Sequence, residues 1–455
     1  MHNNPMNANQ KRSLIRTLKK AILVFFFVAL ILVVVDVVLL VRALVLQNSD
    51  TKATESSVVT SLPSGGDASD SGITPSDSSN STEPTPTASA INITELLPAN
   101  ALSEAYWGPL PEVTSTQVLD HQEVRAIYIG AAANLNTNIA LAQSSEINAF
   151  VVDLKESNGV IFNSTNELAT SIGDVRGAYN LETVVNTCHE NDIRVIGRIV
   201  CFKDPTLAEQ RPDLSIQDAN GQSLKFKNEG SIAFANPYNS ATWDYYISLA
   251  EEAIAMGVDE IQFDYVRFPT GGTTSGESPY FGEEGTTPSR ADAINRFLQT
   301  ARRRIQDTYG VPVTADVFGI ILSSATDGAN LGQDWATIGL TGVDALCPMI
   351  YPSHYALGTN LNGKTFDKPD LYPYDVLYNA LVLGSSAASQ AGYSTVRPYL
   401  QAFTASYIGE GNYKSYSYSD INDQIRALQD AGYSEWILWN PSAAYPSGTY
   451  AGNAG

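Results

Sequence analysis

The chain has 455 residues, which is enough for one large domain or two ordinary ones and for a sizeable buried core. Its 48 Asp and Glu residues outnumber its 27 Lys and Arg residues, and the net charge of -21 repels phosphate backbones, so we expect no nucleic-acid partner. The three cysteines, Cys188, Cys201 and Cys347, include no CxxC pair. We therefore expect no structural zinc site, and we expect the cysteines to be buried as small apolar residues.

The N-terminal region has the pattern of a membrane anchor. Residues 1–20 form a basic tail without acidic residues, and residues 21–42 hold an apolar run that is interrupted by Asp36. The run is long enough for a helix that crosses a bilayer, and the basic tail places the N-terminus in the cytoplasm by the positive-inside rule. Because the run exceeds a usual signal-peptide core and no small-x-small cleavage site follows it, we expect an uncleaved signal anchor.

The next segment, residues 43–95, is rich in Ser, Thr, Gly, Pro and Asp. It has too few large apolar residues to offset the entropy that ordering would cost. We predict a disordered linker that spaces the membrane anchor from a folded domain at residues 96–455.

That domain alternates short apolar runs with amphipathic helical segments. Such alternation requires a parallel sheet with helical crossovers, and eight units in one domain predict an α/β fold of the closed (β/α)8 (TIM) barrel type rather than an open doubly wound sheet. The sixth unit is the weakest, because its helix has to come from the short segment DWATIGL. The expected strands are VRAIYIGA, AFVVDLKES, RVIGRIVCF, DEIQFDYVRF, VPVTADVFG, DALCPMIYP, VRPYLQAFT and EWILWNP, and the clearest helices span residues 181–190, 243–256, 291–309, 374–388 and 421–431.

The connections between these elements are unequal in length. Helix-to-strand turns are brief and marked by glycine, whereas four strand-to-helix connections are long, at residues 203–239, 270–289, 320–334 and 352–372. TIM barrels bind their ligands at the C-terminal ends of the strands, where these connections lie. We therefore expect the functional site at that end.

The strand ends at this face carry charged and aromatic side chains, which filling the barrel does not require. Rings stack on the apolar faces of sugars and charged groups bind hydroxyls, so this composition suits a neutral, hydroxyl-rich ligand. We expect a polysaccharide or oligosaccharide substrate, with no cofactor and no metal. The predicted substrate-binding residues are Asp153, Lys155, Glu156, Arg198, Arg267, Tyr351, His354, Gln401, Trp439 and Asn440.

Two carboxylates are the minimum for glycosidic bond cleavage, and Asp264 and Asp316 end neighbouring predicted strands. Strands lie about 4.8 Å apart, which brings such groups close to the roughly 5–5.5 Å separation of retaining enzymes. We predict Asp264 as nucleophile or stabiliser and Asp316 as general acid, with Asp153 or Glu156 as alternative acids. The competing interpretations are an Asp264–Arg267 ion pair without chemistry and Asp316 as a cap or loop-pinning residue.

Other mouth residues also have structural interpretations. Lys155 and Glu156 are potential partners of each other, and His354 has no second histidine on a neighbouring strand end, so we expect it to line the site rather than bind metal. The two-residue period of a strand puts Trp436 and Trp439 on opposite faces. One of them is therefore expected to pack in the core.

At EIQFDYVRFP, with VVDLKES upstream and ADVFG, PMIYPSHY, RPYLQAF and WILWNP downstream, the sequence resembles a bacterial family of domains of unknown function described as glycosyl hydrolases. The resemblance spans residues 124–441 and implies a barrel distantly similar to the amylase and α-galactosidase types. In those relatives an Asp at the end of strand four is the nucleophile, which implies that role for Asp264. The acid of the amylase type ends strand five, the position of Asp316, but it is a Glu. The Glu of the chitinase signature falls on Val266, so that mechanism is not implied.

The leading hypothesis is a single-pass membrane protein whose extracellular domain hydrolyses a polysaccharide. A catalytically silent carbohydrate-binding barrel at the cell surface is the alternative. A metal-dependent hydrolase requires a histidine cluster that four histidines, one of them in the basic tail, do not provide. The sugar, its linkage and the oligomeric state are not predicted by the sequence.

Overall fold

The computed structural model describes residues 97, 100–113, 117, 119 and 121–452. The predicted basic tail, membrane anchor and linker, residues 1–95, lie outside this part of the chain. Among the described helices, none combines the length and the apolar character that crossing a bilayer requires.

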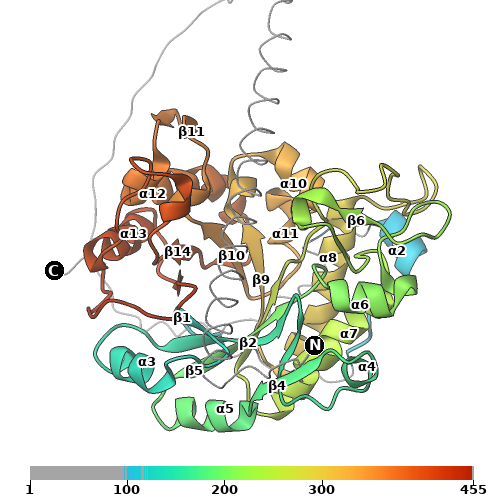
Figure 1. Ribbon diagram of the computed structural model, residues 1–455, viewed down its shortest axis with the longest axis horizontal. Helices are drawn as coiled ribbons and strands as arrows, with labels where there is room; N and C mark the ends of the chain where they lie inside the picture. The colour runs from blue at the N-terminus through green and yellow to red at the C-terminus, as the bar shows by residue number, and fades with distance from the viewer. Residues whose placement is uncertain (1–96, 98–99, 114–116, 118, 120, 453–455) are drawn as a thin grey trace, which may run out of the picture. The chain divides into compact units, whose positions relative to one another are not determined.

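Eight parallel strands form a closed barrel (Figure 1). Each strand is hydrogen-bonded to the next, and the last strand pairs with the first. The predicted (β/α)8 barrel is confirmed, and every predicted strand is present. In barrel order the strands are β1 (Arg125–Gly130), β2 (Ala149–Glu156), β5 (Arg194–Val200), β8 (Glu260–Asp264), β9 (Val313–Phe318), β10 (Ala345–Ile350), β14 (Tyr399–Gln401) and β15 (Trp436–Trp439).

Helices connect successive barrel strands and surround them in Figure 1. The five helices predicted most clearly are present to within a few residues at their ends, and α8 continues through the π-helical turn η5 (Arg302–Gln306) and α9 (Asp307–Tyr309). The weak sixth unit has a helix of only four residues, α11, which α10 (Ala325–Leu331) precedes. The connecting helices are α3 (Leu135–Ala142), α5 (Leu181–His189), α7 (Ser240–Ala255), α8 (Arg290–Ala301), α11 (Trp335–Ile338), α12 (Pro373–Ala388) and α13 (Tyr418–Asp430).

Local sequence sets the ends of the long helices. Ser289 and Asp292 form a capping box at the start of α8, and Ser417 with Asp420 does the same for α13. The α8–α9 segment ends at Gly310, whose φ of 73° is the left-handed conformation that glycine adopts without strain. Gly310 thus ends the helical segment just before β9 begins, at the N-terminal end of the barrel.

The alternation of side chains along each strand separates two cores. On β8, Ile261 and Phe263 point outward into the large apolar core under the helices. Glu260, Gln262 and Asp264 alternate with them and are buried inside the barrel. A smaller apolar cluster fills the interior, with Ala126, Val151, Ile196, Cys347, Tyr399 and Ile437 among its members. All three cysteines are buried and none is in a disulfide.

The four long strand-to-helix connections are present as predicted, and three of them carry small elements of their own. The connection after β5 holds α6 (Pro205–Gln210) and a pair of short strands, β6 (Lys225–Phe226) and β7 (Ile232–Ala233). The connection after β10 holds the hairpin of β11 (Thr359–Leu361) and β12 (Lys364–Phe366). The sequence did not predict a further insertion between β2 and α5. It consists of β3 (Gly159–Phe162), α4 (Glu167–Ser171) and β4 (Val175–Tyr179), and it extends the sheet from the end of β2.

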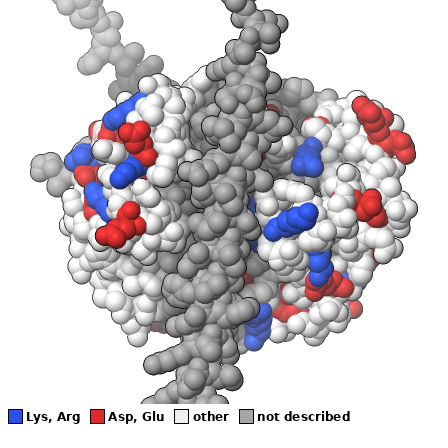
Figure 2. All heavy atoms as spheres, turned by 45° about the horizontal axis from the view of Figure 1, so that its top comes forward, with Lys and Arg blue, Asp and Glu red and all other residues white. Residues whose placement is uncertain are grey.

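The visible surface carries both signs of charge. In Figure 2, Lys and Arg side chains lie near Asp and Glu side chains on the coloured parts of the surface. The excess of acidic residues therefore does not form a single uniform patch on the coloured parts of this face.

Candidate active site

Four charged side chains meet inside the barrel near the C-terminal ends of neighbouring strands. They are Asp153 on β2, Arg198 on β5, Asp264 on β8 and Asp316 on β9. The strand register pairs Asp153 with Arg198, whereas Asp264 is paired with Val200, two residues beyond Arg198 on the same strand. The guanidinium of Arg198 contacts all three carboxylates.

Asp264 is held from two sides. Its Oδ2 accepts hydrogen bonds from Nε and Nη2 of Arg198, at 3.0 and 2.5 Å, and its Oδ1 accepts one from the backbone N–H of Tyr265 at 2.5 Å. Tyr265 has a φ of 52°, a left-handed conformation that is uncommon for a residue with a bulky side chain. Strain of this kind is concentrated at functional sites, and here it fixes the carboxylate at the end of β8.

Asp316 lies beside this pair in a different environment. It is 1% exposed, its Oδ2 is 3.9 Å from Nε of Arg198, and its Oδ1 has no hydrogen-bond partner in the part of the chain that the structure describes. Burial and the charge of Asp264 raise the pKa of Asp316 well above its usual range. Two neighbouring carboxyl groups therefore differ: one is paired with a cation, and the other favours its protonated form.

The distance between the two groups is bounded by their shared partner. Since Asp264 Oδ2 and Asp316 Oδ2 lie 3.0 and 3.9 Å from the same nitrogen, they can be no farther apart than these distances combined. That bound, which applies to one oxygen of each group, includes the separation of about 5–5.5 Å in retaining glycosidases.

Both carboxylate oxygens of Asp153 accept hydrogen bonds. Its Oδ1 accepts from Arg198 Nη1 and its Oδ2 from the hydroxyl of Tyr128, both at 2.5 Å. Asp153 is thus a poor candidate for the general acid. Glu156 is only half-buried, and burial together with the neighbouring Asp153 raises its pKa.

The opposite side of the mouth is aromatic. The ring of Tyr351, which follows β10, is stacked on Trp439 of β15 at 5.7 Å, and Phe403 meets Trp439 edge-on at 5.1 Å. His354 is exposed and its ring lies edge-on to Tyr351 at 4.9 Å. Trp436 is buried in the outer core, as the strand period predicts for one of the two tryptophans. The mouth therefore has a charged half, from β2 to β9, and an aromatic half, from β10 to β15.

A known protein family matches the part of the chain that forms the barrel. The family described as "Putative glycosyl hydrolase domain" matches residues 124–445. The chain belongs to this family. The predicted resemblance to a family of glycosyl hydrolase domains is confirmed, and the match covers the whole barrel from β1 to β15.

This glycosyl hydrolase domain is similar to several solved structures. The PgaB (BpsB) glycoside hydrolase domain from Bordetella bronchiseptica aligns with 71% of the chain and 94% of its own length, at 10% identity and a TM-score of 0.50. A hypothetical protein from Ruminiclostridium thermocellum ATCC 27405 is 38% identical over 42% of this chain and 97% of its own, with a TM-score of 0.37. The α-galactosidase TtGalA from Thermus thermophilus is 12% identical over 72% and 60% of the two chains, with a TM-score of 0.42. No curated protein matches the chain.

Some predicted binding residues of the glycosyl hydrolase domain are not at the mouth. A β-bulge between Asp153 and Lys155 breaks the alternation along β2, and the fully buried Lys155 pairs with Asp204 at 2.9 Å and Asp174 at 3.6 Å. The Lys155 ammonium bonds the backbone oxygen of Glu156 at 3.1 Å. This position holds the β2 insertion in place and does not present Lys155 to a ligand.

Arg267 has a different partner from the one that its spacing suggests. The competing interpretation of an Asp264–Arg267 ion pair is wrong, because Arg267 makes a two-pronged bond to the buried Glu229, at 2.8 and 3.0 Å. That bond ties the end of β8 to the long connection after β5. Gln401 and Asn440 likewise pin loops: Gln401 bonds Ser353 and Asp370, whereas Asn440 bonds the backbone oxygens of Ala402 and Ala444.

Tyr128 and Phe403 contact residues of the candidate site but were not predicted from the sequence as site residues. The signal for Tyr128 was present, because the two-residue period of β1 places Ala126 and Tyr128 on one face, and a polar ring at an inward position requires a partner. Phe403 lies beyond the end of β14, so no period applies to it.

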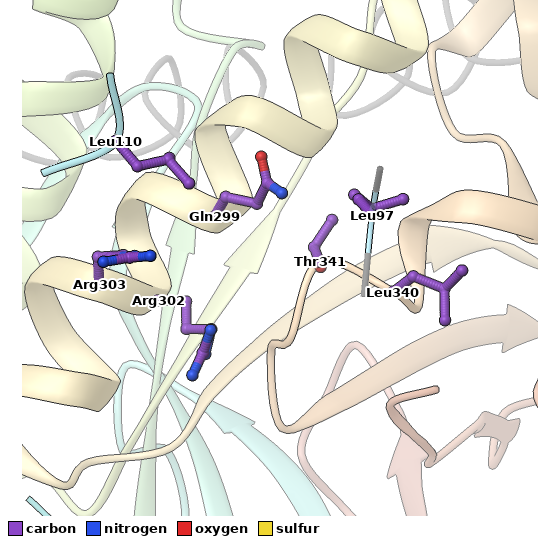
Figure 3. A pocket seen from close by; sticks show the side chains of 7 residues that line it. All are labelled: Leu97, Leu110, Gln299, Arg302, Arg303, Leu340 and Thr341. Atoms are coloured by element: carbon purple, nitrogen blue, oxygen red, sulfur yellow. The ribbon is translucent and has the colours of Figure 1, made fainter. Parts of the chain in front are cut away.

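A separate pocket lies outside the barrel (Figure 3). It is bounded by the N-terminal segment, by α8 with η5, and by the helix-to-strand turn that precedes β10. That turn is at the end of the barrel opposite the charged cluster, so the pocket is not part of the candidate active site. Its lining residues are Leu97, Leu110, Gln299, Arg302, Arg303, Leu340 and Thr341.

Proposed function

We propose that this glycosyl hydrolase domain cleaves a polysaccharide by a retaining mechanism, with Asp264 as the nucleophile and Asp316 as the general acid. The observation that carries the proposal is the contrast between the two carboxyl groups, which both lie near one nitrogen of Arg198. Asp264 is hydrogen-bonded by the guanidinium, whereas one oxygen of Asp316 has no partner among the described residues. Groups with different environments in one site are the pattern of an acid and a nucleophile.

The proposed reaction has two steps. The Asp264 carboxylate attacks the anomeric carbon while Asp316 gives its proton to the leaving glycosidic oxygen, which forms a covalent glycosyl–enzyme ester. Asp316, now ionised, then takes a proton from water, and the resulting hydroxide attacks the anomeric carbon and releases Asp264. Arg198 stays beside Asp264 throughout and compensates its charge. The stacked rings of Tyr351 and Trp439 offer an apolar face for a sugar unit.

The test of hydrolysis uses Asp264→Asn in the full chain. We expect the release of reducing ends from a polysaccharide panel to fall by at least about 1,000-fold, because removal of a nucleophile costs this much or more in comparable enzymes. Oligosaccharide binding, measured as thermal stabilisation, should persist. Asp213→Asn is the matched control, because Asp213 is exposed and pairs with Arg211. Binding without hydrolysis in the wild type would instead support the silent carbohydrate-binding barrel.

Glu156 is the second candidate for the acid, because it is half-buried and its pKa is raised. Aryl glycosides with activated leaving groups need no proton from the enzyme, so loss of the true acid should spare them and impair natural glycosides. We expect this pattern for Asp316→Asn and a smaller, uniform effect for Glu156→Gln. The reverse pattern would transfer the role to Glu156.

We also propose that residues 21–42 anchor the protein in the cell membrane, with the N-terminus in the cytoplasm and the barrel outside. The apolar run and the preceding basic tail support this topology. Protease added to intact cells should remove the barrel and leave a membrane-bound fragment. A barrel that is protected until the cells are lysed would contradict the proposed topology.

A further inference from the structure

A line of hydrogen bonds runs across four neighbouring strands and ends on the proposed nucleophile. The hydroxyl of Tyr128 on β1 donates to Asp153 on β2, Asp153 accepts from Arg198 on β5, and Arg198 donates to Asp264 on β8. Asp153 and Asp264 are almost completely buried, and the side chain of Arg198 is 15% exposed. Water therefore competes little for these bonds.

Two carboxyl groups, those of Asp264 and Asp316, lie within 4 Å of Nε of Arg198. Its Nε donates to Asp264 at 3.0 Å and lies 3.9 Å from Asp316, so a small rotation of the guanidinium would exchange the favoured partner. The guanidinium is planar and rigid, so its nitrogens move together. A hydrogen bond to one nitrogen therefore restricts where the other nitrogens can point. Asp153 holds Nη1, and Tyr128 holds Asp153.

We propose that Tyr128 and Asp153 are positioning residues: they aim the Arg198 fork at Asp264 and away from Asp316, and so keep the cation on the proposed nucleophile and off the proposed acid. This inference rests on the proposed function and extends it from the reacting pair to the side chains that assign the roles. It also gives Asp153 a role other than the substrate binding that the sequence suggested. The raised pKa of Asp316 agrees with a guanidinium directed elsewhere.

The test compares three full-chain variants. Tyr128→Phe removes the hydrogen bond to the Asp153 carboxylate without a change in charge. Tyr179→Phe is the matched control, because the Tyr179 hydroxyl donates to the backbone oxygen of the same Asp153, at 2.7 Å, and not to its carboxylate. Asp153→Asn removes the charge that holds Nη1.

In Asp153→Asn we expect kcat to fall by about 100-fold, as a misplacement of about 1 Å produces, and the alkaline limb of the pH–rate profile to move to lower pH. The direction follows because a freed guanidinium moves closer to Asp316 and favours its ionised form. Tyr128→Phe should move the limb in the same direction by a smaller amount, and Tyr179→Phe should not move it. A purely structural role for the hydrogen bonds predicts the same behaviour for both tyrosine variants, which would overturn the proposal.

A second readout requires no substrate and no hydrolysis. The difference in unfolding free energy between wild type and Asp316→Asn, followed against pH, levels off at the pKa of Asp316 in the folded protein. In a Tyr128→Phe background this plateau should begin at lower pH, and in a Tyr179→Phe background it should not change. An unchanged plateau in the Tyr128→Phe background overturns the inference. A wild type that hydrolyses nothing contradicts the proposed function but leaves this readout intact.

Discussion

The two ends of the barrel interior hold similar sets of charges. At the C-terminal end Arg198 contacts three carboxylates, those of Asp153, Asp264 and Asp316. At the N-terminal end three carboxylates also meet, but two cations contact them. There Arg397 bonds Glu260 and Glu435 and lies 4.0 Å from Asp344, and His121 contacts Asp344 and Glu435.

The N-terminal cluster has one cation more than the C-terminal cluster, and the carboxyl groups of the two clusters differ in their pKa shifts. At the N-terminal end the bonds of His121 and Arg397 lower the pKa of Glu435 despite its burial, whereas burial outweighs Arg397 at Glu260 and raises the pKa of that group. At the C-terminal end the pKa of Asp316 is raised, because burial and Asp264 outweigh the attraction of Arg198. An acid catalyst requires a carboxyl group that holds its proton, and a raised pKa favours that form. Among the described residues Glu260 is bonded by Arg397 and Thr314, whereas Oδ1 of Asp316 has no hydrogen-bond partner, and this difference points to the C-terminal end as the catalytic one.

Loss of Arg397 should break the N-terminal cluster and have the largest effect on stability. Arg397→Met keeps much of the side-chain volume but leaves Glu260 buried without its cation and Glu435 with His121 alone, so we expect a loss of about 3–5 kcal/mol in the free energy of unfolding. Urea denaturation measures this loss. Arg211→Met is the control, because the Arg211–Asp213 pair is exposed and such pairs contribute less than about 1 kcal/mol. Equal losses in the two variants would show that the N-terminal cluster is not a stabilising unit.

Neutral replacements at the two ends should have opposite signs. At pH 7 we expect Glu435→Gln to destabilise the protein by about 1–3 kcal/mol, since the folded state binds the ionised carboxylate through Arg397 and His121. The pKa of Glu435 is lowered on folding, so its contribution is present above the ordinary Glu pKa of about 4.3 and is lost as pH falls through the folded value.

Asp316→Asn should instead stabilise the protein, by about 1–2 kcal/mol at pH 7, while it impairs hydrolysis. The pKa of Asp316 is raised on folding, so the native group disfavours folding more and more as pH rises above the ordinary Asp value of about 3.9. The gain measured by thermal unfolding should therefore disappear near pH 4. A destabilising Asp316→Asn would mean that this carboxyl is a structural residue like Glu435.

The sequence predicts which strands carry the charged residues and which way those residues face, but it does not predict their ion-pair partners. Strand periodicity predicts that Asp264 faces inward, and the order of strands places Asp316 next to it. Pairings between distant residues leave no local trace: Arg397 and Glu260 are 137 positions apart. The nearest cation to Asp264 in the sequence, Arg267, binds Glu229 instead, because the left-handed Tyr265 redirects the chain after β8.

The insertion at the end of β2 shows a second limit of the sequence. Its strands are short, and β3 attaches to the barrel only through Lys155 and Glu156. The bulge that makes this attachment also turns the Lys155 side chain into the protein. Alternation predicts an inward Lys155, and a single bulge is enough to reverse that prediction.

The smallest effect expected is that of His121→Gln, and it tests the cation count on which the comparison depends. Hydrogen bonds to Asp344 and Glu435 raise the pKa of His121 to about 10. A raised pKa means that the stabilisation is complete below the unfolded value of about 6.5 and is lost as pH rises to about 10. Since the side chain is 42% exposed, solvent screens the pair, and we expect a loss of about 0.5–1 kcal/mol at pH 6 that vanishes near pH 10.

A double-mutant cycle of His121→Gln with Glu435→Gln isolates the interaction from other effects of the substitutions. We expect a coupling energy at pH 6 that is absent at pH 10. A coupling that does not change with pH would mean that His121 bonds its partners as a neutral ring. The N-terminal cluster would then have one cation for three carboxylates, as the C-terminal cluster has, and the charge count would no longer explain why the pKa of Glu435 is lowered while that of Asp316 is raised.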